Sequence, residues 1–372
     1  MTDQLQSRVQ QTIDELVATG REVGVQVAAY RHGEPIVDAC AGVADRTTGR
    51  PVTPDTPFFS YSTGKGLIST VVHVLAEQEL LDYDLRIAEV WPEFARHGKE
   101  SVTLRHALTQ SAGVPALPAD VTAEELTDWD RMCAVVADSE PLWAPGTRHG
   151  YHAWTYGWLV GEVVRRVTGR TVGQVLADEV AGPLGVRDEL FLGVPDDQLD
   201  RVAHLEERDW SAALAIMAAH VPHLDRVLPP GVRTDAALAN RRDVRRADIP
   251  AVGTLSARAM ARMYAALLGP VDGVRLVSTA RLSEISSVQV RGTDWVFGQE
   301  SALTLGYAVE ADGAMFGWSG AGGSLAGAAP DLGLSVAVTT NVLAFSPDED
   351  PMEDLRSFIL NGVASIIDPS VA

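Results

Sequence analysis

Residues 60–78 read SYSTGKGLISTVVHVLAEQ and combine a helical pattern with a serine and a lysine three residues apart. Its apolar residues recur at intervals of three and four from Leu67 onward, a spacing that is typical of a helix. We therefore expect a helix that opens at Ser62. Because residues three apart lie on one face of a helix, the amine of Lys65 would reach the hydroxyl of Ser62.

Lysine is rare in this sequence, since Lys65 and Lys99 are the only two lysines among 30 basic residues and the rest are arginines. Arginine cannot give up its proton in a protein, whereas burial or a nearby charge can make lysine neutral. We therefore predict that Lys65 accepts a proton from Ser62 and activates it as a nucleophile. Lys99, in RHGKES, has no such setting and is predicted to be a solvated surface charge.

The composition narrows the class of protein. The 372 residues are 46% hydrophobic, which is enough for one large domain or for two lobes that share a core. A formal net charge of −20 would repel phosphates, so neither nucleic acid nor an anionic membrane is expected as a partner. Only Cys40 and Cys133 are present, which indicates neither a disulfide scaffold nor a structural metal and fits a reducing compartment.

The N-terminal residues 1–20 lack the basic start, apolar core and cleavage site of an export signal. We expect an amphipathic helix there, with an apolar stripe formed by Leu5, Val9, Ile13 and Leu16. The longest uncharged run, residues 313–329, is too rich in glycine to be a membrane-spanning helix. A cytoplasmic protein is therefore the default expectation.

Strand patterns lie at both ends of the chain, and helical patterns lie between them. Two apolar runs flank RHGE within residues 23–46 and predict an antiparallel hairpin. Residues 80–250 alternate helical patterns with turn clusters. The last third predicts a helix at 256–269, strand-prone segments within 316–345 and a closing helix at 352–367.

This order predicts an α+β fold in which one sheet is built from both ends of the chain. We assign residues 1–80 and 250–372 to an α/β lobe and residues 81–249 to an inserted, mainly helical lobe. The active site is expected in the cleft between the two lobes.

A second candidate lies in APGTRHGYHAWTYGW, residues 144–158. Tyr151 follows a Pro-Gly-Thr turn and precedes a helical pattern, so its phenol could project from a loop toward the cleft. An aromatic ring packed on the start of a helix is the alternative for a lone tyrosine. Tyr156 is the alternative base if the helix begins earlier.

The order and approximate spacing of Ser62, Lys65, Tyr151 and the glycine-rich GWSGAGGS at 317–324 resemble the serine β-lactamase and penicillin-binding-protein superfamily. The segments TPFFSYSTGK, LRHALTQSAGVP and PGTRHGY extend the similarity over nearly the whole chain. Within this superfamily, the sequence is most similar to class C β-lactamases and family VIII carboxylesterases. The resemblance implies a β-lactamase/transpeptidase-like fold, with an antiparallel sheet flanked by helices.

The resemblance also implies roles for individual residues. Ser62 would carry the acyl group, Lys65 would accept its proton, and Tyr151 would be the phenolate-like base that relays the proton to the leaving group. The oxyanion would lie between the backbone N–H groups of Ser62 and Ala321. No cofactor or metal is called for.

The sequence departs from class C β-lactamases at the substrate-binding positions. Ala153 replaces the asparagine two residues after the tyrosine, and Trp318-Ser319-Gly320 replaces Lys-Thr-Gly. An indole in place of an ammonium suits an apolar acyl or alcohol group better than a carboxylate. We therefore expect Trp318, Ser319, Gly320 and the adjoining His152 to contact an ester, with weak or no β-lactam hydrolysis.

Two rival kinds of site are rejected. Ser324 lies in GGSLA, near the Gly-x-Ser-x-Gly pattern, but no histidine follows it to complete a triad. The pairs His149/His152 and His220/His223 lack a third metal ligand, so surface or packing roles are expected.

Two segments have weaker functional interpretations. NRRDVRRAD, residues 240–248, could bind an anionic substrate arm or a carrier phosphate, although its own aspartates favour a solvated, self-paired stretch. Residues 204–231 are apolar enough to cover an acyl pocket.

The predicted function is hydrolysis of a small-molecule carboxylic ester through an acyl-enzyme on Ser62. An acyltransferase that passes the same acyl group to an amine or alcohol is an alternative, because both reactions need the same nucleophile; exclusion of water decides between them. A non-catalytic binding protein is the third alternative.

Overall fold

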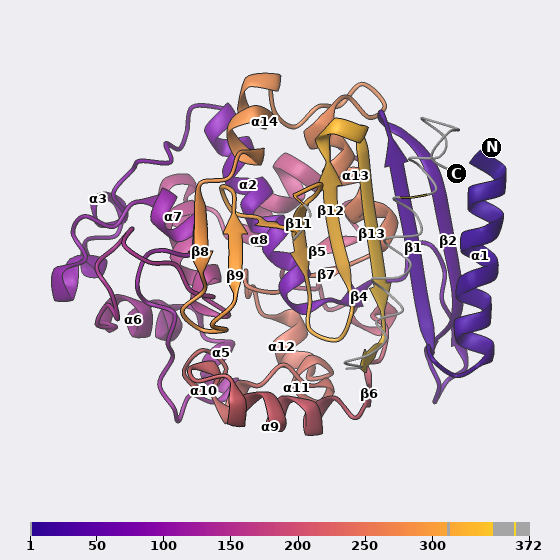
Figure 1. Cartoon of the computed structure of the whole chain (residues 1–372), viewed down its shortest axis with the longest axis horizontal. Coiled ribbons are helices and arrows are strands. Elements are labelled where there is room, and N and C mark those ends of the chain that lie inside the picture. The colour runs from indigo at the N-terminus through magenta and orange to yellow at the C-terminus, as the bar shows by residue number, and fades with distance from the viewer. Residues whose placement is uncertain (1, 311–312, 345–360, 362–372) are drawn as a thin grey trace.

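The computed structural model describes residues 2–310, 313–344 and 361. Its main sheet has nine strands in the order β3-β2-β1-β13-β12-β11-β10-β9-β8, and each neighbouring pair is antiparallel (Figure 1). These strands are β1 (Gly24–Arg31), β2 (Glu34–Asp45), β3 (Arg50–Pro51), β8 (Val290–Thr293), β9 (Glu300–Leu303), β10 (Ala308–Val309), β11 (Phe316–Ser319), β12 (Leu325–Ala329) and β13 (Leu334–Thr340). The sheet is therefore built from both ends of the chain, as predicted.

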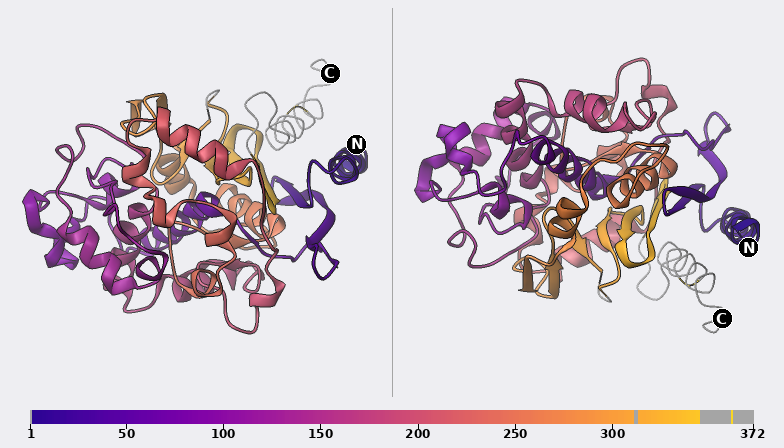
Figure 2. Two further views of the ribbon diagram at one scale, coloured as in Figure 1. Left: turned by 90° about the horizontal axis from the view of Figure 1, so that it is seen from below. Right: turned by 90° about the horizontal axis from the view of Figure 1, so that it is seen from above.

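Helices dominate the chain between the two groups of strands. The α-helices are α1 (Thr2–Ala18), α2 (Lys65–Glu77), α3 (Ile87–Val90), α4 (Leu104–Leu108), α5 (Ala123–Leu126), α6 (Trp129–Asp138), α7 (Thr155–Thr168), α8 (Val172–Val175), α9 (Trp210–His220), α10 (Leu224–Val227), α11 (Ala236–Ala239), α12 (Arg242–Arg246), α13 (Ala257–Leu268) and α14 (Thr279–Ser286). Two short sheets join β4 (Phe58–Phe59), β7 (Thr254–Leu255) and β5 (Leu190–Phe191), and β6 (Glu206–Arg208) with β14 (Val342–Ala344). Both views of Figure 2 place α1 and the first hairpin at one end of the molecule, opposite the helical region.

The predicted hairpin is present and connects β1 to β2 through His32 and Gly33. Both residues have left-handed backbones, with φ of 50° and 86°, the conformation of a tight two-residue hairpin turn. Gly33 is required there, because a Cβ would meet the carbonyl oxygen of Pro270 at 2.3 Å.

Helices cover the two faces of the sheet. The predicted stripe of α1 (Leu5, Val9, Ile13 and Leu16) is buried and packs with Val25, Val27 and Ala29 of β1. On the opposite face, α13 packs against β1, β12 and β13. Because successive strand residues point to opposite faces, Ala28 and Tyr30 of β1 belong to the larger core that also holds α2 and α7.

The segment after β4 differs in detail from the prediction. Ser62 lies in a 3-10 turn, Tyr61–Gly64, and α2 begins only at Lys65. A 3-10 helix has three residues per turn, so side chains three apart lie almost directly above one another. The later helix start therefore brings Ser62 and Lys65 closer to alignment than an α-helix would.

The prediction for Lys99 is wrong. Its side chain is buried and donates to the carbonyls of Ala137 and Ser139, at 3.0 and 2.5 Å, where α6 ends. The last carbonyls of a helix have no partner within the helix, so they can accept hydrogen bonds from a cation. These hydrogen bonds compensate for the burial of the Lys99 amine. Burial lowers the pKa of Lys99 to about 8.

Two other predictions remain untested. The closing helix at 352–367 lies outside the described residues, apart from residue 361. The division into lobes at about 80 and 250 stays a prediction.

Across the described ranges, none of the helices combines the length and the apolar character needed to span a bilayer.

Candidate active site

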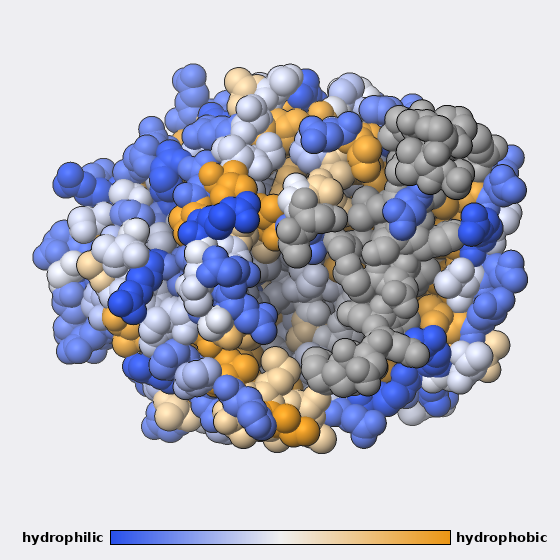
Figure 3. Space-filling view, viewed as in Figure 1, coloured by the Kyte–Doolittle hydropathy of each residue, from blue (hydrophilic) through white to orange (hydrophobic). Residues whose placement is uncertain are grey.

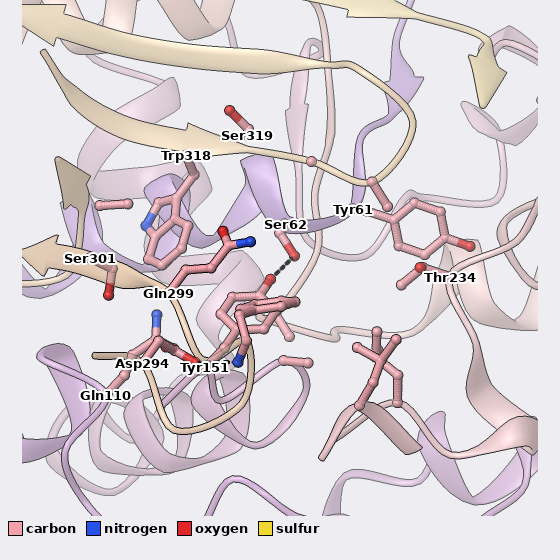
Figure 4. A pocket seen from close by; sticks show the side chains of 18 of the residues that line it. Tyr61, Ser62, Gln110, Tyr151, Thr234, Asp294, Gln299, Ser301, Trp318 and Ser319 are labelled. Carbon is pink, nitrogen blue, oxygen red and sulfur yellow. Dashed lines mark hydrogen bonds between the residues drawn. The ribbon is translucent and has the colours of Figure 1, made fainter. Parts of the chain in front are cut away.

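Ser62, Lys65 and Tyr151 form a triangle of hydrogen-bonding groups. The Ser62 Oγ lies 2.5 Å from the Tyr151 hydroxyl (Figure 4). The Lys65 Nζ lies 3.0 Å from Ser62 Oγ and 3.1 Å from the Tyr151 hydroxyl. The three predicted groups therefore meet in the folded chain. Ser62 comes from the 3-10 turn before α2, Lys65 is the first residue of α2, and Tyr151 lies in the loop before α7.

Close backbone packing holds the Ser62 turn in place. Tyr61 has a left-handed backbone, with φ of 41°, which turns the chain sharply out of β4. Gly64 lies so close to Gly253 that a Cβ would meet its amide nitrogen at 2.0 Å. At Gly320 a Cβ would meet the Ser60 carbonyl oxygen at 2.2 Å, so glycine allows the end of β11 to reach the turn.

Lys65 is fully buried beside the serine. Burial lowers the pKa of Lys65 to about 7, because the ammonium would lose its hydration. Its third hydrogen bond goes to the carbonyl of Ala251 at 3.3 Å, and its Nζ lies over the rings of Tyr151 and Trp318 at 4.9 and 5.9 Å. A substantial fraction of the molecules therefore carries a neutral amine at pH 7.

Tyr151 holds its proton in the free protein. Burial raises its pKa to about 12, although the hydrogen bond with Ser62 acts in the opposite direction. A protonated phenol differs from the phenolate-like state that was predicted. The alternative base, Tyr156, is fully buried and shares a hydrogen bond of 2.7 Å with Ser69, so its hydroxyl serves the core rather than the triangle.

The predicted oxyanion donors lie at two backbone turns. Ser62 is in the first turn of a 3-10 helix, where amides have no partner within the helix. Ala321 follows β11 and lines the same cavity as Ser62. Within residues 2–310 and 313–344, no acceptor lies within hydrogen-bond distance of the Ala321 amide. Its role as a donor to a bound oxyanion stays a prediction.

The triangle opens into a cavity of about 460 Å³. One wall is apolar and comes largely from α9 and the residues that follow it: Trp210, Leu214, Met217, Leu224 and Leu228. Residues 204–231 therefore do cover a pocket next to Ser62. Figure 3 shows apolar side chains gathered over α9 on the outer surface as well, where Ile216 is 63% exposed.

The ionisable carboxyl groups of the cavity lining have no basic counterpart among the described lining residues. Asp294, Glu300 and Glu310 line the cavity, and no lysine or arginine does so among the described lining residues. Asp294 accepts hydrogen bonds from the amides of Val296 and Phe297, and burial raises the pKa of its carboxyl group.

The predicted substrate-binding residues divide into two groups. Trp318, Ser319 and Gly320 line the cavity, and the indole of Trp318 donates to the carbonyl of Gly306 at 2.7 Å. His152 is not among the lining residues and is fully buried. Its ring nitrogens form hydrogen bonds with the Gly150 carbonyl and the Val114 amide, so the position next to Tyr151 does not bring the ring to the cavity.

Sequence reasoning missed several cavity residues. Gln110, Thr234, Asp294 and Gln299 all line the cavity (Figure 4). Gln110 lies within LRHALTQSAGVP, which resembles a known segment, but no local pattern separates it from an ordinary loop residue. The others lie far along the chain, so only folding reveals that they meet Ser62.

The other histidine and serine candidates have packing roles. His149 shares a hydrogen bond of 2.8 Å with Ser301, and His223 stacks on Trp295 with ring centroids 3.7 Å apart. No group of three or more metal-ligating side chains was found in the described part of the chain. Ser324 is buried and its hydroxyl accepts from the Thr340 amide.

The basic island at 240–248 is paired, but mostly with acids elsewhere. Arg241 binds Asp243 inside the island and Glu124 outside it, both at 2.6 Å. Two further arginines pair with other segments: Arg242 with Asp200 and Arg246 with Asp196. The expected self-pairing therefore holds for one arginine, and acids of neighbouring segments neutralise these two.

A serine hydroxyl, a buried amine and a phenol that share hydrogen bonds beside an apolar cavity define a class of enzymes that transfer acyl groups through serine. A family model described as Beta-lactamase matches residues 9–360, and the chain belongs to that family. This confirms the resemblance and the fold class expected from the motifs.

Individual relatives agree with this assignment. The Esterase/beta-lactamase LipL of Mycobacterium tuberculosis (strain ATCC 25618 / H37Rv) is 33% identical over 338 residues, which cover 86% of this chain and 77% of LipL. The crystal structure of a family VIII carboxylesterase is 32% identical with a TM-score of 0.84, covering 95% of this chain and 97% of that one. A penicillin-binding protein homologue from Caulobacter crescentus is also 32% identical with a TM-score of 0.84, covering 96% and 97%.

Proposed function

We propose that the protein is a serine esterase that forms an acyl-enzyme on Ser62. The observation that carries this proposal is the position of the buried Lys65 amine, 3.0 Å from the Ser62 hydroxyl. The esterase names of LipL and of the family VIII carboxylesterase support ester hydrolysis as the reaction class. The apolar wall of the cavity fits a small uncharged ester.

In the acylation step, the neutral amine of Lys65 takes the proton of Ser62 as Oγ attacks the ester carbonyl. The Oγ–C bond forms, and the carbonyl oxygen becomes an oxyanion. The amides of Ser62 and Ala321 stabilise that charge; one such donor typically contributes about 10²–10³ in rate.

In the collapse of the intermediate, the bond to the alcohol oxygen breaks. Tyr151 donates its proton to the leaving alcohol and recovers one from the Lys65 ammonium, across the 3.1 Å hydrogen bond between them. The amine is neutral again at the end of this step. Water then attacks the acyl group by the same route in reverse, and Ser62 leaves with its proton restored.

Efficient β-lactam hydrolysis is not part of the proposal. A β-lactam carries a carboxylate, which would face an indole at Trp318 and the acidic lining of the cavity. An anion without a cationic partner in a partly buried site loses affinity.

Cys40 and Cys133 are both free, which suits a reducing cytoplasm.

The proposal is tested by incubating the protein with an activated short-chain ester and determining its intact mass. We expect one acyl adduct, located on the peptide that contains Ser62, and release of the alcohol. Ser62→Ala should give neither. Absence of both adduct and turnover in the wild-type protein would instead support a non-catalytic binder. Accumulation of amide when an amine is added, in place of free acid, would support the acyltransferase.

A further inference from the structure

Gln110 lines the cavity with a hydrogen bond left unmade. Its side chain is only 1% exposed, and its Oε1 accepts from the amide of His152 at 2.7 Å. The Nε2 is buried, and no acceptor for it lies within hydrogen-bond distance in the described part of the chain. A buried donor without a partner is costly, so such a group in a cavity indicates a ligand that supplies the acceptor.

The orientation of this carboxamide is fixed by its neighbours. Only an oxygen can accept from the His152 amide, so the nitrogen must occupy the other position. The backbone is held as well, since the Gln110 carbonyl accepts from Gly150 and its amide donates to Ala107. Gln110 has a left-handed φ of 52°, as does Tyr61 across the cavity with 41°. Strained residues of this kind concentrate at functional sites.

The location of Gln110 suits contact with a substrate rather than with the reacting atoms. It holds the residue that follows Tyr151, and Figure 4 shows it on the side of the cavity with Asp294 and Ser301. Neighbouring Ala153 offers no polar side-chain group.

We propose that the Gln110 Nε2 donates a hydrogen bond to a second carbonyl oxygen of the substrate, distinct from the one that Ser62 attacks. This inference rests on the proposed esterase function and specifies its substrate class. The preferred esters carry an amide, ketone or further ester carbonyl on the acyl or the alcohol side. A carboxylate is disfavoured as the acceptor because Asp294, Glu300 and Glu310 line the same cavity.

The test compares esters of equal chain length with and without a second carbonyl. On the acyl side, the pair is N-acetylglycine methyl ester and methyl pentanoate. On the alcohol side, it is 2-acetamidoethyl acetate and pentyl acetate. We expect kcat/KM of the wild-type protein to be roughly tenfold or more higher for the carbonyl-bearing member of one pair, because a site built to donate a hydrogen bond rejects an analogue that lacks the acceptor.

Two variants of Gln110 separate substrate binding from support of the fold. Gln110→Glu keeps an oxygen for the His152 amide and, when its carboxyl group is ionised, replaces the donor with an acceptor. Gln110→Leu removes both the acceptor and the donor. We expect both variants to lower the preferred pair's ratio roughly tenfold, whatever their effect on the absolute kcat/KM of either ester. Gln289→Leu, outside the cavity, should leave the ratio unchanged. If Gln110→Leu fails to fold, Gln110→Glu decides the question.

Binding to a Ser62→Ala background separates this inference from the esterase proposal. Fluorescence titration with the two members of each pair should show the same preference and the same dependence on Gln110. If the wild-type protein turns over neither ester but the preference in binding follows Gln110, the reaction is wrong and the binding role stands. If both Gln110 variants keep the wild-type ratio of kcat/KM, because the two esters lose activity equally or not at all, the substrate-binding role is wrong.

Discussion

The Tyr151 hydroxyl lies 3.1 Å from the Lys65 amine, and burial acts on the two groups in opposite directions. It lowers the pKa of Lys65 to about 7 and raises the pKa of Tyr151 to about 12. The phenol therefore keeps its proton across the neutral range, while the amine can give its proton up. In the proposed reaction, the amine is therefore the group that accepts the proton of Ser62, and the phenol is the donor for the leaving alcohol.

Replacing Lys65 by arginine should abolish most activity although the positive charge is retained. A guanidinium cannot act as a proton acceptor at accessible pH, so we expect kcat to fall about a thousandfold or more. Steady-state kinetics with an activated ester measures this. Lys99→Arg alters the other buried lysine and should keep kcat within a few fold. Retention of most activity by Lys65→Arg would remove proton acceptance from the mechanism.

The two tyrosines beside the cluster should respond differently to loss of the hydroxyl. Tyr151→Phe removes the proton donor to the leaving group and should lower kcat by about 10²–10⁴. Tyr156→Phe breaks the buried hydrogen bond to Ser69 and a longer one to the Gly306 carbonyl, and should lower stability by about 1 kcal/mol. Kinetics and thermal unfolding of both variants distinguish them. An equal loss of kcat would mean that the assignment of Tyr151 is incorrect.

Acylation should depend on pH through the Lys65 amine. Because burial lowers its pKa to about 7, the rate constant for acylation should rise as the amine loses its proton and level off above about pH 8. Stopped-flow measurement of alcohol release gives the profile. A rate that falls across this range would contradict a neutral amine as the base.

Stability provides an independent check of the same pKa. The folded pKa of about 7 lies below the ordinary lysine pKa of 10.5, so the unfolded chain binds more protons between these values. The stability of the wild-type protein relative to Lys65→Met should therefore rise with pH, by about 3 kcal/mol between pH 7 and 9.5. Urea unfolding at the two pH values measures the difference.

The charge of the cavity should select against anionic esters. Asp294, Glu300 and Glu310 line it, and no basic side chain does so among the described lining residues. For an ester and its carboxylate-bearing analogue of equal length, we expect kcat/KM to favour the neutral compound about tenfold or more, since like charges disfavour binding. The difference should shrink as salt is added. Equal rates for both compounds would mean that the acids are too far away or neutral.

The apolar wall on α9 should set the size of the substrate. Met217 lines the cavity, whereas the adjacent Ile216 points to solvent. Met217→Trp should shift the preferred ester to shorter chains, because the larger ring occupies part of the cavity. Ile216→Trp, on the exposed side of the same helix, should leave the preference unchanged. A chain-length series assayed with both variants gives the answer.

Local sequence patterns were enough to predict much of the fold and the core of the site. The spacing of Ser62 and Lys65 lies within one helical turn, so their proximity follows from geometry that the sequence itself encodes. The stripe of α1 and the turn at His32-Gly33 are equally local. Tyr151 was also identified, but through a motif, since no local rule links residues 62 and 151.

Other features depended on the surroundings that the folded chain supplies. Both lysines are buried, and only the folded structure reveals their partners. Lys99 donates to carbonyls at the end of a helix, whereas Lys65 forms a hydrogen bond with the Ser62 hydroxyl. His152 adjoins Tyr151 in sequence but lies outside the cavity, because successive residues of a loop can point in different directions.

The sequence alone was enough to predict the candidate nucleophile, its neighbouring amine and the strands that flank them, because periodicity and short spacing act within a few residues. The tertiary structure decided the protonation of Lys65, the acidic and apolar walls of the cavity, and the unpaired donor of Gln110. Desolvation and pocket shape arise from segments far apart in the chain, so they exist only after those segments have packed together.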